Sequence, residues 1–423
     1  MRADVARNSV LVLSAILLGN VFNYVYYVLL GRSVSLRDYG SVMSLVSAIL
    51  LAFGVGSIVQ TIVAKVAADL RAAGDPRRMD AFSRGILRSS LFMGSAILVA
   101  AILLRGIVAR YLHLERPELV AVAGATAAIG FPVLFQRGLF QGFGSFKRFA
   151  ISSSLDGAKA FFILPLAARL GALGALSAYL AAGVLSAGYG AVMLRKRFST
   201  GPLDAGLDFR RLLRTAGATG GASISIVVLM FYDVVLAKHY VTPGEASLYS
   251  AAALAGRVLL AACSFLPIVL LPDIAQRSAS GRPDRHVLGA TVGIALGIIG
   301  VALIACALEP ALLLRILAGR AFERAAPLLL LYVAASAGLA LANLLVMYAI
   351  ARHRFSFTPY VALAALCEIV AVLLRHGTSM QIVQDVVAGH LAVCVVMVVW
   401  VVAHLVNAPV PGPQPRAIHV HTR

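Results

Sequence analysis

Charged residues are scarce in this chain of 423 residues, because they make up only 13% of it. Soluble domains carry about 25% charged residues, so the scarcity excludes a soluble globular domain. Hydrophobic residues make up 60% of the chain. They form continuous stretches of about 18 residues or more, each long enough to cross a bilayer as a helix. Continuous rather than alternating hydrophobicity also excludes β-barrel patterning. The composition therefore predicts an all-α integral membrane protein.

Cysteine is also rare, and its pattern excludes two common uses. All four cysteines lie within apolar stretches, and none forms a CxxC pair or a Cys/His cluster. A disulfide framework and a zinc site are therefore excluded. The sequence lacks Walker A, HExxH and GxSxG motifs as well, so direct use of ATP and these hydrolytic chemistries are not expected. We predict no catalytic residue, no metal site and no cofactor.

Acidic residues are half as numerous as basic ones, with 18 Asp and Glu against 37 Lys and Arg. The basic residues are scattered over short loops instead of forming one surface, so no nucleic-acid partner is expected. Placing both termini in the cytoplasm puts about twice as many Lys and Arg residues inside as outside. Cytoplasmic loops of membrane proteins show this excess. We therefore predict cytoplasmic termini, with the basic loops contacting anionic lipid.

The apolar stretches predict about twelve transmembrane helices. These cover residues 8–31, 40–65, 86–108, 118–143, 149–170, 172–194, 214–238, 247–272, 287–308, 327–351, 356–374 and 380–406. The most basic loop contains the breaker Gly201-Pro202 and separates two sets of six helices. The predicted organisation is an N-terminal lobe (1–197), a cytoplasmic linker (198–213), a C-terminal lobe (214–407) and a disordered tail (408–423).

The two lobes look like repeats of each other. LGRSVSLRDYGSVMSLVSA in the first lobe and LAKHYVTPGEASLYSAAALAG in the second both join a first span to a second one. Tyr39 and Tyr249 hold similar places, and Arg137 falls opposite Asn343. Because each lobe has an even number of spans, the repeats run parallel. Transporters built from repeats place their substrate between the halves near the bilayer midplane. We therefore expect a central cavity between the lobes.

Three cations lie inside predicted spans, where charge is expensive and normally faces a cavity. They are Arg137, Lys159 and Arg257, and we predict that they line the cavity and contact an anion. Each has an alternative. Arg137 has no acid nearby in sequence and either contacts substrate or extends to the cytoplasmic face. Lys159 either contacts substrate or pairs with Asp156, three positions earlier, and Arg257 either contacts substrate or pairs with Asp233.

Polar residues inside the spans provide a second set of candidates. The acids Asp156, Asp233 and Glu368 are candidates for ion coupling, a common role of membrane carboxylates. His390 also lies within a span, and we interpret it as structural. The uncharged candidates for the cavity wall suit sugar hydroxyl groups, or else form hydrogen bonds between helices. They are Asn20, Asn23, Tyr27, Gln141 and Asn343.

Four segments carry a resemblance to a known family. They are LLGRSVSLRDYGSVMSL, GLFQGFGSFKRF, FYDVVLAKHYVTPGEASLYSAA and FLPIVLLPDIAQ. In this order and spacing, and with the six-plus-six layout, the chain resembles a Wzx-type flippase of polysaccharides or lipid-linked oligosaccharides. That family shares a superfamily with lipid II flippases and multidrug-and-toxin extrusion transporters. The resemblance covers nearly the whole chain, although lipid II flippases typically have fourteen spans.

The resemblance implies a function. It implies transfer of an undecaprenyl-diphosphate-linked glycan to the outer leaflet of the bacterial cytoplasmic membrane, through a cationic cavity with alternating access. It also implies a polysaccharide polymerase and other assembly proteins as partners. A multidrug efflux antiporter is the alternative within the superfamily. A membrane glycan polymerase or glycosyltransferase is a further alternative, although such enzymes usually need larger outer loops than this sequence provides.

Overall fold

The computed structural model describes residues 2–195, 209–279, 285–352 and 354–406, and the regular structure of these residues is entirely helical. The first half of the chain contains α1 (Arg2–Ser33), α2 (Leu36–Ala73), α3 (Pro76–Tyr111), α4 (Glu118–Gly142), α5 (Phe146–Leu155), the 3₁₀ turn η1 (Asp156–Ala158), α6 (Lys159–Leu170) and α7 (Ala172–Leu194). The second half contains α8 (Phe209–Tyr240), α9 (Pro243–Ala279), α10 (Arg285–Leu308), α11 (Pro310–Leu317), η3 (Arg320–Ala325), α12 (Ala326–Ala351), α13 (Thr358–Leu374), α14 (Ser379–Val401) and the π-turn η4 (Val402–Val406). The predicted all-α class is confirmed.

Local sequence explains where several helices begin and end. Ser35 caps the start of α2 by accepting a hydrogen bond from the backbone N–H of Asp38 over 3.1 Å. Gly74 ends α2 with a positive φ of 69°, a conformation that glycine adopts without a steric penalty. Asp75 then caps α3 through the N–H of Arg78, directly before the proline that opens the helix. The α2–α3 turn is therefore specified locally.

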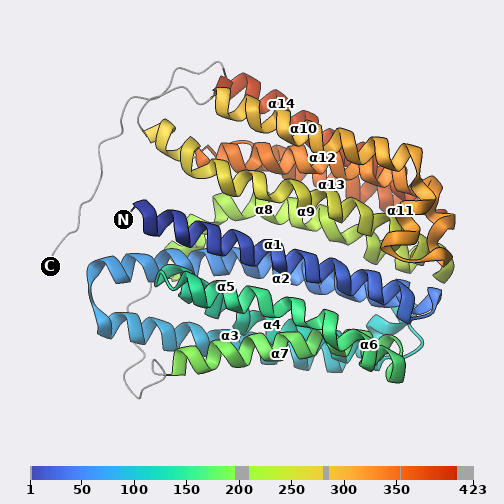
Figure 1. Cartoon of the computed structure of the whole chain (residues 1–423), viewed down its shortest axis with the longest axis horizontal. Coiled ribbons are helices and arrows are strands. Elements are labelled where there is room, and N and C mark those ends of the chain that lie inside the picture. The colour runs from blue at the N-terminus through green and yellow to red at the C-terminus, as the bar shows by residue number, and fades with distance from the viewer. Residues whose placement is uncertain (1, 196–208, 280–284, 353, 407–423) are drawn as a thin grey trace.

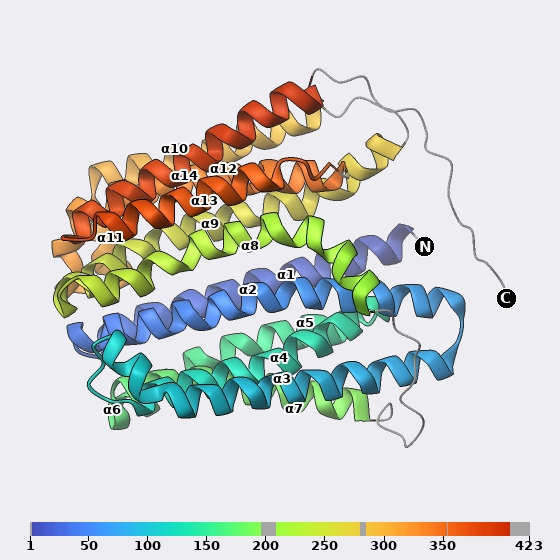
Figure 2. The same cartoon turned by 180° about the vertical axis from the view of Figure 1, so that it is seen from behind.

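The helices lie roughly parallel and antiparallel in two groups. Figures 1 and 2 show α3 to α7 on one side and α10 to α14 on the other, with α1, α2, α8 and α9 between them. Helix α2 packs against α4 within the first half and against both α8 and α9 across the junction, while α12 packs against α9 and α14. Sequence neighbours thus stay together, and α2 is the main bridge between the halves.

The outer surface of the bundle is suited to lipid. Ten helices among the described residues are long and apolar enough to cross a membrane, and α13 is a shorter apolar helix of 17 residues. Large apolar side chains are exposed on them, including Phe92 (76%) and Leu103 (74%) on α3 and Leu374 (77%) on α13. In water such surfaces would associate, whereas hydrocarbon solvates them. The protein is a multi-pass membrane protein, and the count of twelve spans remains a prediction.

The predicted domain boundaries fall largely on undescribed residues. Residues 198–208 of the expected linker and the whole expected tail 408–423 lie outside the described part of the chain. Residues 209–213, which we expected in the linker, instead form the start of α8. The division into lobes at 197 and 214 therefore remains a prediction.

Close contact between α2 and α4 depends on glycine. A Cβ atom added at Gly138 would lie 2.7 Å from the carbonyl oxygen of Gln60, and one at Gly142 would overlap the backbone of Ala64. Such distances are too short for any side chain, so both positions allow the two helix backbones to touch. This contact sets the depth of α4 in the bundle and therefore the position of Arg137.

Candidate functional site

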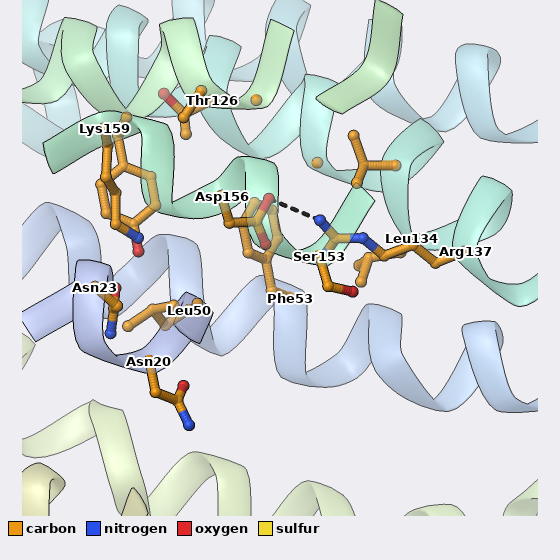
Figure 3. A pocket seen from close by; sticks show the side chains of 16 residues that line it. Asn20, Asn23, Leu50, Phe53, Thr126, Leu134, Arg137, Ser153, Asp156 and Lys159 are labelled. Atoms are coloured by element: carbon orange, nitrogen blue, oxygen red, sulfur yellow. Dashed lines mark hydrogen bonds and ion pairs between the residues drawn. The ribbon is translucent and has the colours of Figure 1, made fainter. Parts of the chain in front are cut away.

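A polar cavity of about 270 Å³ lies among the helices of the first half. Its wall is formed by residues of α1, α2, α4, α5, η1, α6 and α7, and Figure 3 shows the side chains that point into it. Five predicted residues line it: Asn20, Asn23, Arg137, Asp156 and Lys159. We expected the cavity between the two lobes, but this one lies inside the first half, because α1, α4 and α7 surround it.

Arg137 of α4 is buried in the cavity wall and held by several acceptors. Its Nε donates to Ser152 Oγ over 3.1 Å, and its Nη2 donates to Ser152 O over 2.7 Å. Nη2 also lies 3.2 Å from Ser186 Oγ of α7 and 2.7 Å from Asp156 Oδ1. Only 11% of the side chain is exposed. The guanidinium therefore does not extend to the cytoplasmic face, which was the alternative reading.

Asp156 pairs with Arg137 rather than with Lys159. The alternative reading of Lys159 paired it with Asp156 because three positions separate them on one span. The structure corrects this alternative, since α4 brings the Arg137 guanidinium to 2.7 Å from the carboxylate. Helix spacing identifies neighbours on one helix only, whereas this partner comes from another helix. Figure 3 shows the ion pair as the dashed line across the cavity.

Lys159 is buried at the other end of the cavity, against two tyrosine rings. Its Nζ lies 3.8 Å from the ring centroid of Tyr179 and 5.6 Å from that of Tyr26. Aromatic faces attract an ammonium group within about 6 Å, more strongly where water is excluded. No carboxylate within the described part of the chain lies within ion-pair distance of this ammonium. Lys159 is therefore a buried basic side chain whose Nζ contacts two tyrosine rings.

Asn20 and Asn23 of α1 complete the wall opposite these charges. Helix α1 approaches η1 closely at Gly157, where a side chain would not fit. A Cβ atom added there would lie 2.7 Å from Cβ of Phe22. Sequence reasoning missed three further polar residues of the wall, namely Thr126, Ser153 and Tyr179. The run of three serines from Ser152 to Ser154 inside an apolar span was the available signal for one of them. Thr126 and Tyr179 are isolated in sequence.

The other uncharged candidates lie outside this cavity. Tyr27 is buried beside the rings of Tyr24 and Tyr26. Gln141 accepts a hydrogen bond from Nε2 of Gln60 over 2.9 Å, which links α4 to α2. Asn343 lines a separate small cavity of about 50 Å³ in the second half. Gln141 therefore forms a hydrogen bond between helices, which was the alternative to a place in the cavity wall.

Arg257 of α9 lies at the junction of the halves, not in the cavity. Its Nη2 donates to Ser47 Oγ over 2.9 Å, and its guanidinium carbon lies 4.8 Å from the ring centroid of Phe231. Within the described residues, its Nε and Nη1 have no hydrogen-bond partner. The alternative pairing with Asp233 is not observed, and two tyrosines donate to one oxygen of that carboxylate. Tyr249 and Tyr332 donate to Asp233 Oδ2 over 2.8 Å and 2.5 Å.

Glu368 of α13 belongs to a second buried polar cluster in the second half. Its Oε1 accepts a hydrogen bond from Tyr232 over 2.9 Å and lies 3.4 Å from Nε2 of His390 on α14. The sequence did not show this partner of Glu368, because His390 follows it by more than twenty positions on the next helix. We read His390 as structural, and the structure places it against one of the ion-coupling candidates.

Comparison with solved structures defines the fold class. The chain matches an inward-facing multidrug resistance MATE family transporter of the MOP superfamily with a TM-score of 0.74 and 14% identity, covering 93% of this chain and 97% of that one. It matches the lipid II flippase MurJ in an inward closed conformation with a TM-score of 0.74 and 9% identity, covering 94% and 87%. A eukaryotic MATE transporter matches with a TM-score of 0.67 and 15% identity, covering 94% and 96%. At these identities the likeness shows a shared fold.

The sequence itself defines the family. A family model described as polysaccharide biosynthesis protein matches residues 5–277, from the start of α1 to near the end of α9. The chain therefore belongs to the polysaccharide biosynthesis protein family, which confirms the resemblance seen in the sequence. No curated protein matches the chain at a significant level.

Proposed function

We propose that this protein moves an undecaprenyl-diphosphate-linked oligosaccharide from the inner to the outer leaflet of the bacterial cytoplasmic membrane. Membership of the polysaccharide biosynthesis protein family supports a glycan-related role. The fold shared with MurJ and MATE transporters supports transport rather than catalysis. The hydrophobic outer surface keeps the protein in the same bilayer as its proposed substrate.

The chemistry of the cavity is the observation that carries this proposal. A diphosphate group is recognised by ammonium and guanidinium groups, which Lys159 and Arg137 provide. Sugar hydroxyl groups are matched by the amides of Asn20 and Asn23. The volume of about 270 Å³ is near the lower end of ligand sites, which span roughly 300–1,000 Å³. The cavity thus suits the diphosphate and its adjoining sugar instead of the whole oligosaccharide.

Contacts between the two halves support alternating access. Nη2 of Arg32 donates to the carbonyl of Ile316 over 3.1 Å. The ring centroids of Tyr39 and Phe322 lie 4.5 Å apart. These contacts share one end of the bundle, where α1 ends and α11 lies (Figure 1). We propose that this end faces the outside and is closed here, and that the two lobes rock about the α2 junction to open it. Both termini are then cytoplasmic.

The polar clusters of the second half have a place in this scheme. We propose that Arg257 contacts the anion as it passes the junction, since its Nε and Nη1 have no hydrogen-bond partner among the described residues. Asp233 and Glu368 remain candidates for ion coupling, with His390 as the neighbour of Glu368. A polysaccharide polymerase and other assembly proteins are the proposed protein partners on the outer side.

Loss of the protein in its native strain tests the function. We expect the lipid-linked repeat unit to accumulate in the inner leaflet and surface polysaccharide to disappear. Restoring the wild-type gene should reverse both effects, whereas restoring an Arg137→Ala gene should reverse neither. Normal polysaccharide export in the deletion strain, with no second flippase expressed, would overturn the proposal.

A drug-resistance assay separates the alternative of multidrug efflux, which the MATE-like fold supports. The chain is expressed in a host that lacks its own drug pumps, and resistance to cationic drugs is measured. We expect resistance to stay at the level of the empty vector. Raised resistance together with unchanged glycan export would favour the efflux function.

A further inference from the structure

The guanidinium of Arg137 is held in place by neutral groups as well as by Asp156. Ser152 accepts two of its hydrogen bonds, through Oγ at 3.1 Å and through the backbone carbonyl at 2.7 Å. Ser186 contributes a third contact at 3.2 Å, and the two serine hydroxyls lie 3.1 Å apart. These partners belong to α5 and α7, on either side of the guanidinium. Arg137 therefore keeps its position whether or not Asp156 is ionised.

Asp156 lies on the open side of this ion pair. Its side chain is 47% exposed, whereas that of Arg137 is 11% exposed. Figure 3 shows the carboxylate between Lys159 and the guanidinium, with its hydrogen bond directed to Arg137. An anion that enters the cavity meets the carboxylate and the guanidinium together. While Asp156 is ionised, it competes with that anion for Arg137.

The net charge of the cavity wall depends on whether Asp156 carries a proton. The charged or titratable residues of the wall are Arg137 from α4, Asp156 from η1, Lys159 from α6 and Tyr179 from α7. With Lys159 protonated, Asp156 ionised and Tyr179 neutral, two cations and one anion leave a single net positive charge. With Asp156 protonated, the wall carries two positive charges. A diphosphate diester carries two negative charges, so only the protonated cavity is neutral when loaded.

We infer that Asp156 takes up a proton when the diphosphate head group binds, so that Arg137 is released from its ion pair and contacts the anion. This inference rests on the function proposed above. Coupling between two ligands is reciprocal, so a proton at Asp156 strengthens anion binding and the anion strengthens proton binding. Neutrality of the loaded cavity also lowers the cost of holding the diphosphate at membrane depth. The affinity for the head group therefore rises as the pH falls.

A soluble head-group analogue tests the coupling on the purified, full-length protein. The probe is geranyl-diphospho-glucose, a diphosphate diester whose own charges do not titrate between pH 5 and 8. Calorimetric titration in two buffers with different ionisation enthalpies gives the number of protons taken up on binding. For the wild type we expect uptake approaching one proton. The dissociation constant should rise with pH by up to about tenfold per unit over the range in which binding takes up a proton.

Asp156→Asn imitates the protonated state. This variant should bind the probe at pH 8 as tightly as the wild type does at pH 5, with no proton uptake. Asp385→Asn is the matched control, because Asp385 pairs with Arg375 at 3.0 Å, outside the cavity. It should retain the wild-type pH dependence and proton uptake. Adding Arg137→Ala to Asp156→Asn should abolish the tight binding.

The outcomes distinguish this inference from the proposed function. Binding of the probe by the wild type without proton uptake overturns the inference and leaves the proposed function intact. Weaker binding by a folded Asp156→Asn protein at pH 8 also overturns it, because Asp156 is then a direct partner of the ligand. Failure of the wild type to bind the probe at any pH overturns the function proposed for the cavity. The wild-type proton count holds even if the variant does not fold.

Discussion

Arg257 of α9 donates a hydrogen bond to Ser47 of α2, although 210 positions separate the two residues in the chain. The bond spans 2.9 Å and crosses the junction between the first and the second half. A second contact at the same place is the hydrogen bond from the Tyr24 hydroxyl to the carbonyl of Arg257, also 2.9 Å long. Arg257 therefore connects α9 to both α1 and α2.

Truncating the two partners of this bond should give different results. Ser47→Ala leaves a buried cationic donor unpaired, so we expect a loss of about 1–3 kcal/mol in the stability of the folded protein. Thermal unfolding in detergent measures this loss, and glycan export should persist.

Arg257→Ala should reduce export severalfold at equal protein level, because it removes the charge at the junction. Equal export by Arg257→Ala and the wild type would contradict a role of this cation in transport.

Arg137 should be the most sensitive cation of the cavity. Arg137→Ala should abolish glycan export while the protein still inserts and accumulates. Arg137→Lys should retain partial activity, because an ammonium group supplies charge but cannot reach the acceptors on both sides of the planar guanidinium. Arg375→Ala is a control that removes an arginine paired with Asp385 outside the cavity, and it should export normally. Export by Arg137→Ala at the wild-type rate would refute the assignment.

Gly389 should tolerate no side chain, because a Cβ there would overlap the side chain of Glu368. Gly389→Ala should therefore destabilise the protein by about 1–3 kcal/mol, as expected when a packed interior receives an extra methyl group. Gly297→Ala is the matched control, since nothing lies within 4 Å of its added Cβ. It should be neutral or slightly stabilising. Equal unfolding temperatures for the two variants would show that α13 and α14 pack less closely than described.

Reporter fusions test the orientation of the bundle. The α2–α3 turn at Asp75 and the end of α11 at Leu317 lie at opposite ends in Figure 1. A fusion at Asp75 should report the cytoplasm, and fusions at Glu115 and Leu317 should report the outside. The excess of Lys and Arg in the segments assigned to the inside motivates this orientation. The reverse pattern at all three sites would invert the protein, and a mixed pattern would contradict the helix order.

Composition and hydrophobic stretches were enough to predict the membrane, the all-helical class and the positions of most helices. This succeeds because a backbone in hydrocarbon has to satisfy its hydrogen bonds internally, which leaves a helix as the simplest solution for each long apolar stretch. Ser35 and Asp75 mark helix starts because their side chains accept hydrogen bonds from backbone N–H groups of the first turn, which have no partner within the helix. The motifs that join α1 to α2 and α8 to α9 also sufficed to indicate the family.

Only the tertiary structure decided which charges meet. From the sequence, Asp156 had Lys159 as its near neighbour, but the packing of α4 beside α5 placed Arg137 against it. Glu368 had no partner nearby in the sequence until α14 brought His390 to it. Helical spacing orders residues along one helix, whereas the partner of a buried charge is chosen by the neighbouring helix. For this reason the sequence alone determined which residues are costly in the membrane, and the packing determined how each one is satisfied.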